Sequence, residues 1–340
     1  MLFLRLSGHT NGKGSERMCT AVSYQADHHY FGRTLDLECS FGEQVTVTPR
    51  KYPFLFVDGQ HLAQHYAIIG MARVQKNYPL YYDAANEKGL SMAALNFQDH
   101  AFYMPKSQGV MNIAPFELIA WVLGQCKNVG EAKILLRKTN IADFSFDKTL
   151  PNTPLHWMIA DACCSIVVEP CKDGLRIYDD PAGILTNSPP FEQQVNRLSR
   201  YTHLTNRPPN PLFCGKIQTK QESRGMGAFG LPGDFSSSSR FVKAAFVTQN
   251  SVVANERSGV GQFFHILGSV SQPMGSVQLQ NGEYVRTVYS SCINTDLGIY
   301  YYTTYENQQI TAVDLHREDL GAQELIVYDL ITEQQINEQN

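Results

Sequence analysis

The sequence lacks three features that would each indicate a broad class of protein. It has no basic excess, since 28 Lys and Arg stand against 32 Asp and Glu for a formal net charge of −4, whereas a general nucleic-acid binder carries a basic surplus. No apolar run approaches the roughly 18 residues of a membrane-spanning helix. The opening apolar stretch is short and is interrupted by Arg5, unlike the core of a signal peptide. We therefore expect no nucleic-acid partner, no membrane and a cytoplasmic location.

The 8 cysteines also lack the spacing of a metal or redox site. None forms a C-x-x-C pair, and no histidines are spaced near them as zinc ligands would be. We therefore predict no metal. Most of the cysteines, including Cys163 and Cys164 within an apolar strand, are interpreted as small buried hydrophobes in a reducing compartment. Only Cys19 has a context that indicates chemistry.

The distribution of polar and apolar residues divides the chain into two segments. The polar, glycine-rich stretch from Ser7 to Arg17 has no periodicity, so residues 1–18 are expected to be a leader that is disordered or not translated. Residues 19–340 are expected to form one domain. Strands and helices occur there in separate blocks without βαβ alternation, which predicts an α+β fold with helices layered on antiparallel sheets.

The individual elements follow from hydrophobic periodicity and turn residues. A break at Ala26 to His28 predicts a hairpin, the last three strands predict a meander, and residues 205–224 are expected to be irregular. Strands are predicted at 20–24, 29–33, 45–49, 67–72, 91–97, 155–161, 165–169, 174–178, 285–292, 298–305 and 309–314, and helices from Pro115 and at 129–138, 191–201, 240–246 and 262–269.

The glycine-dense segment Gly225–Gly233 contains G-x-G-x-x-G. It follows no clear strand of a βαβ unit, and no helix opens at its last glycine, so it does not indicate a dinucleotide site. We interpret it as a mobile loop beside a pocket.

Cys19 would carry both a thiol and an α-amine if it were the first residue of the mature chain. A free amine titrates near ~8 and a free thiol near ~8.5, so the amine can act as base for its own side chain. Amide hydrolysis also needs oxyanion donors and a positive field that stabilises a thiolate. Asn96 and Asn187 offer uncharged N–H donors, and Arg240 offers a permanent cation. Taken singly, each of these three residues also fits a structural role at the end of an apolar segment.

From Met18 to near its end, the chain resembles the choloylglycine hydrolase family of N-terminal nucleophile hydrolases, which includes conjugated bile acid hydrolases and penicillin V acylases. The motifs that carry the resemblance follow one another in order along the chain. They are 18–21 (MCTA), 30–36 (YFGRTLD), 81–90 (YYDAANEKGL), 95–97 (LNF), 155–157 (LHW), 183–189 (GILTNSP), 230–234 (GLPGD), 239–241 (SRF), 290–292 (SSC) and 298–302 (GIYYY).

The resemblance implies a four-layer αββα sandwich, a homotetramer and no cofactor. It implies that Cys19 is the nucleophile, that Arg33 holds and polarises the thiol, and that Asp36 positions the α-amine. Asn187 and Asn96 would form the oxyanion hole, and Arg240 would add positive field. The expected substrate is a glycine- or taurine-conjugated bile acid, because bile salt hydrolases resemble this chain in having Asn at position 96, where penicillin V acylases tend to have Tyr. The steroid body would lie against four residues, namely Leu35, Phe41, Ala228 and Phe229.

One departure from the family pattern leaves alternatives open. Family members usually have the cysteine directly after the initiator Met, whereas 18 residues precede Cys19 here. Translation could begin at Met18, the leader could be removed by self-cleavage, or the protein could be inactive; we favour the first. The alternative functions are a penicillin V acylase or another acyl-amide hydrolase of the family, and a non-catalytic binder of amphiphiles that retains its leader.

Overall fold

The computed structural model describes residues 18–148, 150–253 and 256–340, and the strands within these ranges form two large antiparallel sheets. The first, sheet A, contains both the predicted hairpin and the predicted meander, so these two expectations are confirmed. Its neighbouring strands are, in order, β14 (Ile184–Leu185), β1 (Met18–Gln25), β2 (His29–Leu37), β17 (Arg286–Asn294), β18 (Ile299–Thr304) and β19 (Thr311–Asp314).

The second sheet, sheet B, has eight strands in the described part of the chain. It joins the middle of the sequence to one strand from near the C-terminus. In spatial order its strands are β13 (Gly174–Asp179), β12 (Ser165–Cys171), β11 (Leu155–Ala160), β8 (Ser91–Asn96), β7 (Tyr78–Asn86), β6 (Ile68–Gln75), β3 (Gln44–Thr48) and β20 (Ile326–Asp329).

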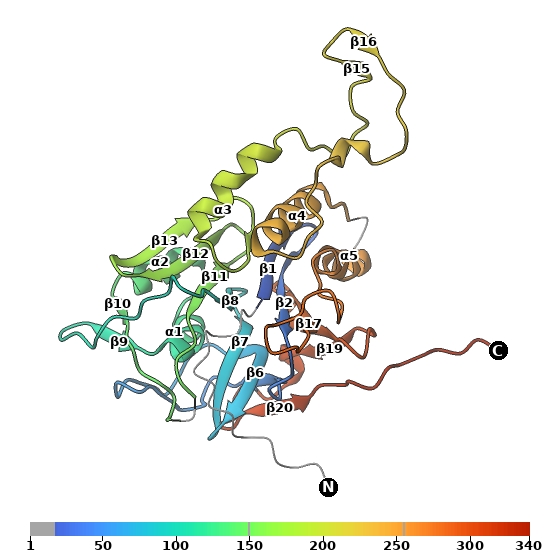
Figure 1. Cartoon of the computed structure of the whole chain (residues 1–340). Coiled ribbons are helices and arrows are strands. Elements are labelled where there is room, and N and C mark those ends of the chain that lie inside the picture. The colour runs from blue at the N-terminus through green and yellow to red at the C-terminus, as the bar shows by residue number, and fades with distance from the viewer. Residues whose placement is uncertain (1–17, 149, 254–255) are drawn as a thin grey trace.

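Helices cover the outer face of each sheet (Figure 1). On sheet B lie α1 (Leu118–Gln125), preceded by a 3-10 turn at Pro115–Glu117, and α2 (Val129–Leu136). On sheet A lie α4 (Ser237–Asn250) and α5 (Glu256–Gly268), and α3 (Phe191–Arg197) packs against α4. The order helices, sheet, sheet, helices confirms the predicted αββα fold.

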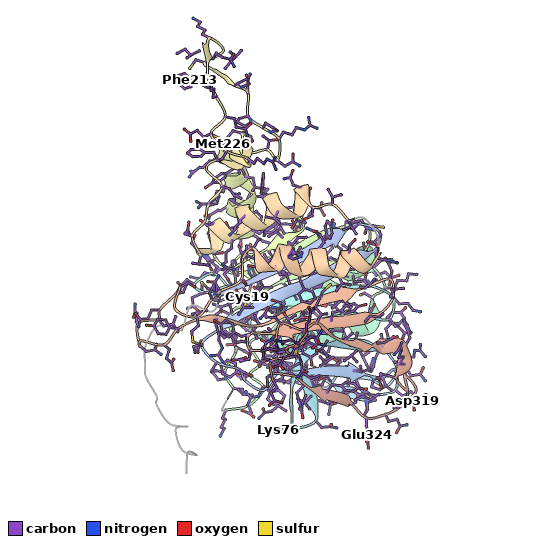
Figure 2. The ribbon with its side chains drawn as sticks, turned by 90° about the vertical axis from the view of Figure 1, so that its right-hand side faces the viewer. Cys19, Lys76, Phe213, Met226, Asp319 and Glu324 are labelled. Carbon is purple, nitrogen blue, oxygen red and sulfur yellow. The ribbon has the colours of Figure 1, made fainter. Side chains whose placement is uncertain are left out.

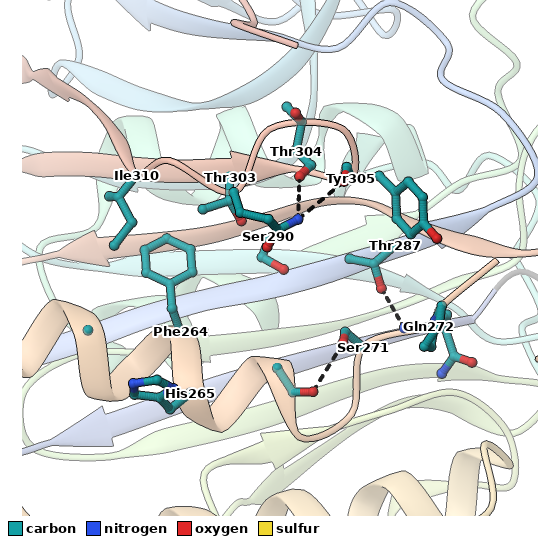
Figure 3. Close-up of a pocket in the computed structure, with 14 residues that line it drawn as sticks. Phe264, His265, Ser271, Gln272, Thr287, Ser290, Thr303, Thr304, Tyr305 and Ile310 are labelled. Carbon is teal, nitrogen blue, oxygen red and sulfur yellow. Dashed lines mark hydrogen bonds between the residues drawn. The ribbon is translucent and has the colours of Figure 1, made fainter. Parts of the chain in front are cut away.

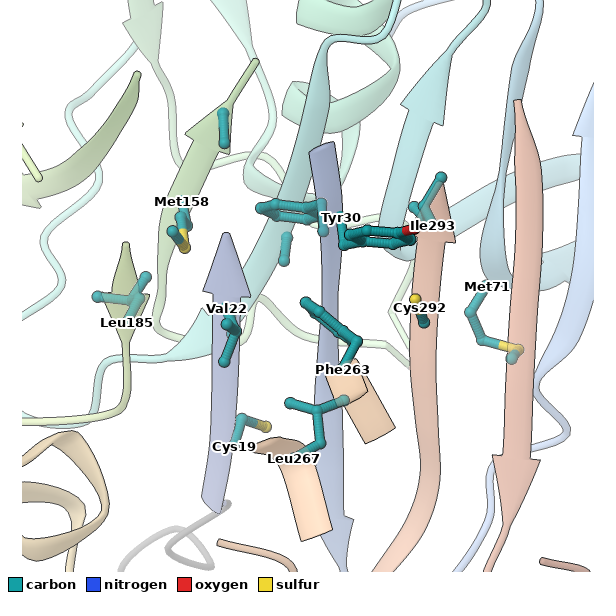
Figure 4. Packing of buried hydrophobic residues seen from close by; sticks show 14 of the residues in the cluster. Cys19, Val22, Tyr30, Met71, Met158, Leu185, Phe263, Leu267, Cys292 and Ile293 are labelled. Atoms are coloured by element: carbon teal, nitrogen blue, oxygen red, sulfur yellow. The ribbon is translucent and has the colours of Figure 1, made fainter. Parts of the chain in front are cut away.

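Burial on both faces explains why the central strands are continuously apolar rather than alternating. All nine residues of β2 are buried, because one face meets α5 and the other meets sheet B. Tyr30 and Phe263 pack together on the helix side, in the same cluster as Cys19 and Leu267 (Figure 4). A second cluster fills the space between sheet B and α1, with Trp121 and Trp157 among its members. The nucleophile candidate therefore belongs to the buried cluster that includes residues of β2 and α5.

Several local predictions need correction. Cys163 and Cys164 lie exposed in the turn between β11 and β12, because Asp161 accepts hydrogen bonds from both of their backbone N–H groups. The predicted helix at 262–269 begins earlier, at Glu256, and α4 is longer than the predicted 240–246. The leader prediction for residues 1–17 lies outside the described residues, while Met18 belongs to β1.

Residues 205–224, expected to be irregular, form an arm that projects from the body (Figure 1) and carries a short hairpin. Figure 2 shows Phe213 near its tip and Met226 at its base. The remaining short elements are β4 (Phe54–Leu55) with β5 (His61–Leu62), β9 (Met111–Ile113) with β10 (Thr139–Ile141), β15 (Leu212–Phe213) with β16 (Ile217–Gln218), and 3-10 turns at Leu198–Tyr201, Met226–Ala228 and Leu315–Arg317.

Gly32 provides a test of how closely β2 and β17 pack. A Cβ atom at this position would lie 2.0 Å from the Ser291 carbonyl oxygen, so Gly32→Ala forces the two strands apart. We expect a loss of about 3 kcal/mol or more in the free energy of unfolding, measured by denaturant titration. Gly261→Ala in α5 is the control, since its Cβ would meet nothing within 4 Å and alanine favours helix by up to ~1 kcal/mol. Equal stability of Gly32→Ala and the unmodified chain would contradict this packing.

Candidate active site

Cys19 lies on β1 at the wall of a cavity of about 510 Å³ and is 2% exposed. Arg33, Leu35, Phe41 and Asn96 line the same cavity, so the fold brings together five of the predicted site residues. The lining also includes apolar residues that sequence reasoning missed, among them Leu37, Leu80, Phe116, Phe146 and Leu150. Nothing in their local patterns distinguishes these residues from ordinary core positions.

Asn187 joins the start of β1 to sheet B. Its Oδ1 accepts a 2.8 Å hydrogen bond from the Cys19 backbone nitrogen, and its Nδ2 donates a 2.9 Å bond to the Asn96 carbonyl. The position of Asn187 follows from β14, which pairs with β1 through Ala21 and Leu185. The two asparagines predicted for the oxyanion hole are therefore in direct contact beside Cys19.

Arg240 reaches the same point from the first turn of α4, a helix that Ser236 caps. Its guanidinium donates to Asn187 Oδ1 at 2.8 Å, to Thr20 Oγ1 at 2.7 Å and to the Cys19 carbonyl. Burial lowers the pKa of Arg240, while Asp36 and Cys19 oppose that shift. With an ordinary value far above neutrality, the side chain stays a cation.

Arg33 crosses from sheet A to sheet B. Its Nη1 donates to the carbonyls of Tyr82, at 3.1 Å, and Ala94, and its Nε donates to the Thr34 carbonyl. Burial lowers its pKa, but the thiol of Cys19, Tyr289, Asp83 and Asp36 together raise it above the ordinary value. A permanent, fixed cation thus lines the cavity next to the thiol.

Asp36 is buried one residue beyond the Cys19–Leu35 pair, opposite Met18 in the ladder. Its carboxylate accepts hydrogen bonds from Thr34 Oγ1 at 3.0 Å and from Thr287 Oγ1 at 2.7 Å. Burial raises its pKa, and Arg240, the two threonine hydroxyls and Arg33 work against that rise. In the described chain the Cys19 nitrogen bonds Asn187 rather than Asp36.

Two of the expected substrate-binding residues lie elsewhere. Ala228 and Phe229 are in the turn at the base of the arm, and Phe229 is 80% exposed. Neither lines the cavity beside Cys19. The G-x-G-x-x-G segment therefore does not contribute to this pocket in the conformation described.

A second cavity of about 620 Å³ lies between α5 and strands β17 and β18 (Figure 3). Thr287 lines it while donating to Asp36, so one threonine separates this cavity from the site. His265 and Phe264 line its helix side. It contains none of the predicted site residues.

Within residues 18–148, 150–253 and 256–340, no group of three or more His, Cys, Asp or Glu side chains is arranged to hold a metal ion. None of the described helices is long and apolar enough to cross a membrane.

Comparison with known proteins identifies the family of the chain. The family of linear amide C–N hydrolases described as the choloylglycine hydrolase family matches residues 19–328, beginning at Cys19 itself. The chain belongs to the choloylglycine hydrolase family. It is therefore a carbon–nitrogen amide hydrolase by family, and the resemblance seen in its motifs is confirmed.

Similar proteins extend over nearly the whole chain. A bile salt hydrolase/transferase from Lactiplantibacillus plantarum is 50% identical over 319 residues, which cover 94% of this chain and 98% of that protein. The crystal structure of a mutant conjugated bile acid hydrolase from Clostridium perfringens superposes with a TM-score of 0.88 at 35% identity, covering 95% of this chain and 100% of that one. A penicillin V acylase from Agrobacterium tumefaciens has a TM-score of 0.73 at 20% identity, covers 92% of this chain and 91% of that one, and shares the fold.

Arg240 gives the test of this constellation. Arg240→Ala removes a buried cation beside Cys19, so the thiolate loses a stabilising charge. We expect amide hydrolysis to fall by roughly 100-fold in kcat/KM, and the acid limb of the pH–rate profile to move to higher pH. Lys243→Ala, further along α4, is the matched control and should leave the profile in place. If Arg240→Ala keeps the original pH profile, Arg240 has only a structural role.

Proposed function

We propose that the protein hydrolyses the amide bond of glycine- or taurine-conjugated bile acids, with Cys19 as the nucleophile. One observation carries this proposal: Cys19 lines a cavity whose charged lining residues, in the described chain, are the cations Arg33 and Arg73, with much of the remaining wall apolar. A conjugated bile acid is an apolar ring system joined by an amide to a small anion. Its shape and its charge both match such a cavity.

The chemistry begins with the α-amine of Cys19 taking the proton of its own thiol. The thiolate attacks the amide carbon, a C–S bond forms, and the carbonyl oxygen becomes an oxyanion. The C–N bond then breaks as the α-ammonium gives its proton to the departing glycine or taurine nitrogen. Water, deprotonated by the same amine, attacks the thioester carbon, and cleavage of the C–S bond releases the free bile acid and restores Cys19.

Asn96 and Asn187 are proposed to stabilise the oxyanion. Each asparagine amide carries two N–H donors, and the contact between Asn187 and the Asn96 carbonyl uses one of the two on Asn187. The second remains for the substrate. Removing one such donor typically costs 10²–10³ in kcat. Arg33 and Arg240 favour the thiolate, and Asp36 is proposed to hold the α-amine once Cys19 is the first residue.

The choice of bile salt over penicillin V rests on relatives and on one residue. The relative at 50% identity and the structure at 35% identity are a bile salt hydrolase/transferase and a conjugated bile acid hydrolase, whereas the penicillin V acylase is 20% identical. Asn96, at a position where family penicillin acylases tend to have Tyr, lines the cavity. Leu35 and Phe41 are proposed to contact the steroid.

We further propose a homotetramer located in the cytoplasm. The arm exposes apolar side chains at Phe213 and Ile217, which are 64% and 60% exposed. Exposed apolar groups on a projecting segment are typical of contacts between subunits. All 8 cysteines are free thiols, as expected in a reducing compartment.

The mature chain is proposed to begin at Cys19, through translation from Met18 and removal of that Met. The family match starts at Cys19, and the mechanism needs a free α-amine there. Intact-mass measurement of the active protein is expected to give the mass of residues 19–340. A chain that retains Met1, binds deoxycholate and leaves its conjugates uncut would instead support the non-catalytic binder.

Side-by-side rates on glycodeoxycholate and penicillin V test the substrate. We expect hydrolysis of the conjugate to exceed that of penicillin V by at least about tenfold in kcat/KM, a difference of roughly 1.4 kcal/mol in transition-state binding. Cys19→Ala should abolish both activities, which shows that they depend on the thiol. A preference for penicillin V would overturn the bile salt assignment and leave the amide hydrolase intact.

A further inference from the structure

Asp83 is a buried carboxylate behind the nucleophile that the proposed mechanism does not use. It lies on β7 of sheet B, and its side chain reaches across to sheet A. Three hydroxyls donate to it: Tyr289 at 2.6 Å, Tyr300 at 2.7 Å and Ser291 at 3.1 Å. The residue is completely buried and does not line the cavity beside Cys19.

The Arg33 side chain extends between the sheets in the opposite direction to that of Asp83. It starts on β2 of sheet A and ends on the carbonyls of Tyr82 and Ala94 in sheet B. Ser291 links Arg33 to Asp83, since its hydroxyl accepts a 3.1 Å hydrogen bond from the Arg33 backbone N–H and donates one to Asp83 Oδ1. A cation from one sheet and an anion from the other are thus fixed in the same interior layer.

Arg33 and Asp83 influence each other's ionisation. The Arg33 cation acts to lower the pKa of Asp83 against the rise caused by burial, and Asp83, after Cys19 and Tyr289, acts to raise the pKa of Arg33. Asp36 acts in the same direction on Arg240. Cys19 interacts electrostatically with Arg33 from β2 and Arg240 from α4, and Asp36 follows Leu35, the residue that pairs with Cys19 in the ladder. Tyr289 and Tyr300 face Asp83 from β17 and β18.

The hydrogen bonds favour the ionised form of Asp83, although burial leaves its pKa raised. Burial raises its pKa, and Arg33, Tyr289, Tyr300 and Ser291 act against that rise. Three donors directed at two oxygens suit a carboxylate, which only accepts, better than a carboxylic acid, which must also donate.

We propose that Asp83 is a positioning residue that, as an ionised carboxylate, balances the charge of Arg33 and thereby sets how strongly Arg33 stabilises the Cys19 thiolate. This inference rests on the proposed role of Cys19 as nucleophile. It does not place Asp83 in contact with substrate; the residue acts through Arg33.

Alkylation of Cys19 by iodoacetamide at a series of pH values tests the proposal. Peptide mass mapping separates Cys19 from the other seven cysteines. Asp83→Asn keeps the size of the side chain and removes its charge, so Arg33 acts on the thiol without its counter-ion. We expect the midpoint of Cys19 alkylation to move to lower pH by about one unit, the scale of one buried charge at short range.

Asp180→Asn is the matched control, because Asp180 is also a buried carboxylate but lines a different cavity, beside β13 and the turn before β14. It should leave the Cys19 midpoint in place. A Tyr289→Phe, Tyr300→Phe double variant provides a second route that retains Asp83. Loss of two donors favours protonation of Asp83, so the midpoint should again move to lower pH.

Two results would overturn the proposal: an unmoved midpoint in a folded Asp83→Asn protein, or a midpoint that moves to higher pH. If Asp83→Asn does not fold, the double variant decides the matter by the same criterion. The readout is alkylation and not hydrolysis, so it separates this inference from the proposed function. An unmodified protein that alkylates normally but cleaves no conjugate would contradict the proposed function alone.

Discussion

The site depends on keeping two arginines, Arg33 and Arg240, charged in the protein interior. A buried cation is tolerated only when hydrogen bonds and opposite charges replace the water it has lost. Arg33 obtains three carbonyl oxygens and the nearby Asp83, and Arg240 obtains the Cys19 carbonyl, Asn187 and the nearby Asp36. Apart from the Thr34 carbonyl beside Arg33, these partners come from other segments of the chain, so the folded sandwich holds the two charges in place.

This requirement connects the catalytic geometry to the topology. The Asn187 side chain binds the nitrogen of Cys19, the guanidinium of Arg240 and the carbonyl of Asn96, which come from β1, α4 and β8. Displacing any one of these three elements leaves a buried polar group without its partner, at a cost of about 1–3 kcal/mol or more for a charged group. Cys19, the proposed nucleophile, is therefore positioned by the same contacts that join the helix layer, sheet A and sheet B.

The sequence motifs predicted which residues belong to this network, but they did not predict which residues contact one another. Cys19, Arg33 and Asn187 lie in ordered family motifs. The strand and helix blocks between them predicted an α+β fold with helices layered on antiparallel sheets, and the family resemblance implied the αββα order of the layers. The donors that surround Asp83 begin 206 residues further along the chain, and no local period indicates such a pairing. For Ala228 and Phe229 the sequence predicted a contact that the structure does not have, because a glycine-rich loop can adopt many backbone conformations. Sequence alone therefore predicted a pocket contact where the structure has the base of an arm.

In their ionised forms, the carboxylates Asp36 and Asp83 would offset the two buried cations Arg33 and Arg240. With Asp36 and Asp83 ionised and the thiol neutral, the four charged side chains sum to zero; transfer of the thiol proton to the α-amine creates a thiolate and an ammonium and leaves that sum unchanged. The charges therefore need to be arranged around the thiol rather than added to it, which is the condition for electrostatic preorganisation. Arg33 and Arg240 can stabilise the Cys19 thiolate. Asp36, which follows the Cys19 partner Leu35 on β2, and Asp83 on β7 of sheet B offset the charge of the two arginines. In the proposed mechanism, the remaining requirement is a free α-amine at Cys19, which acts as the base for this thiol.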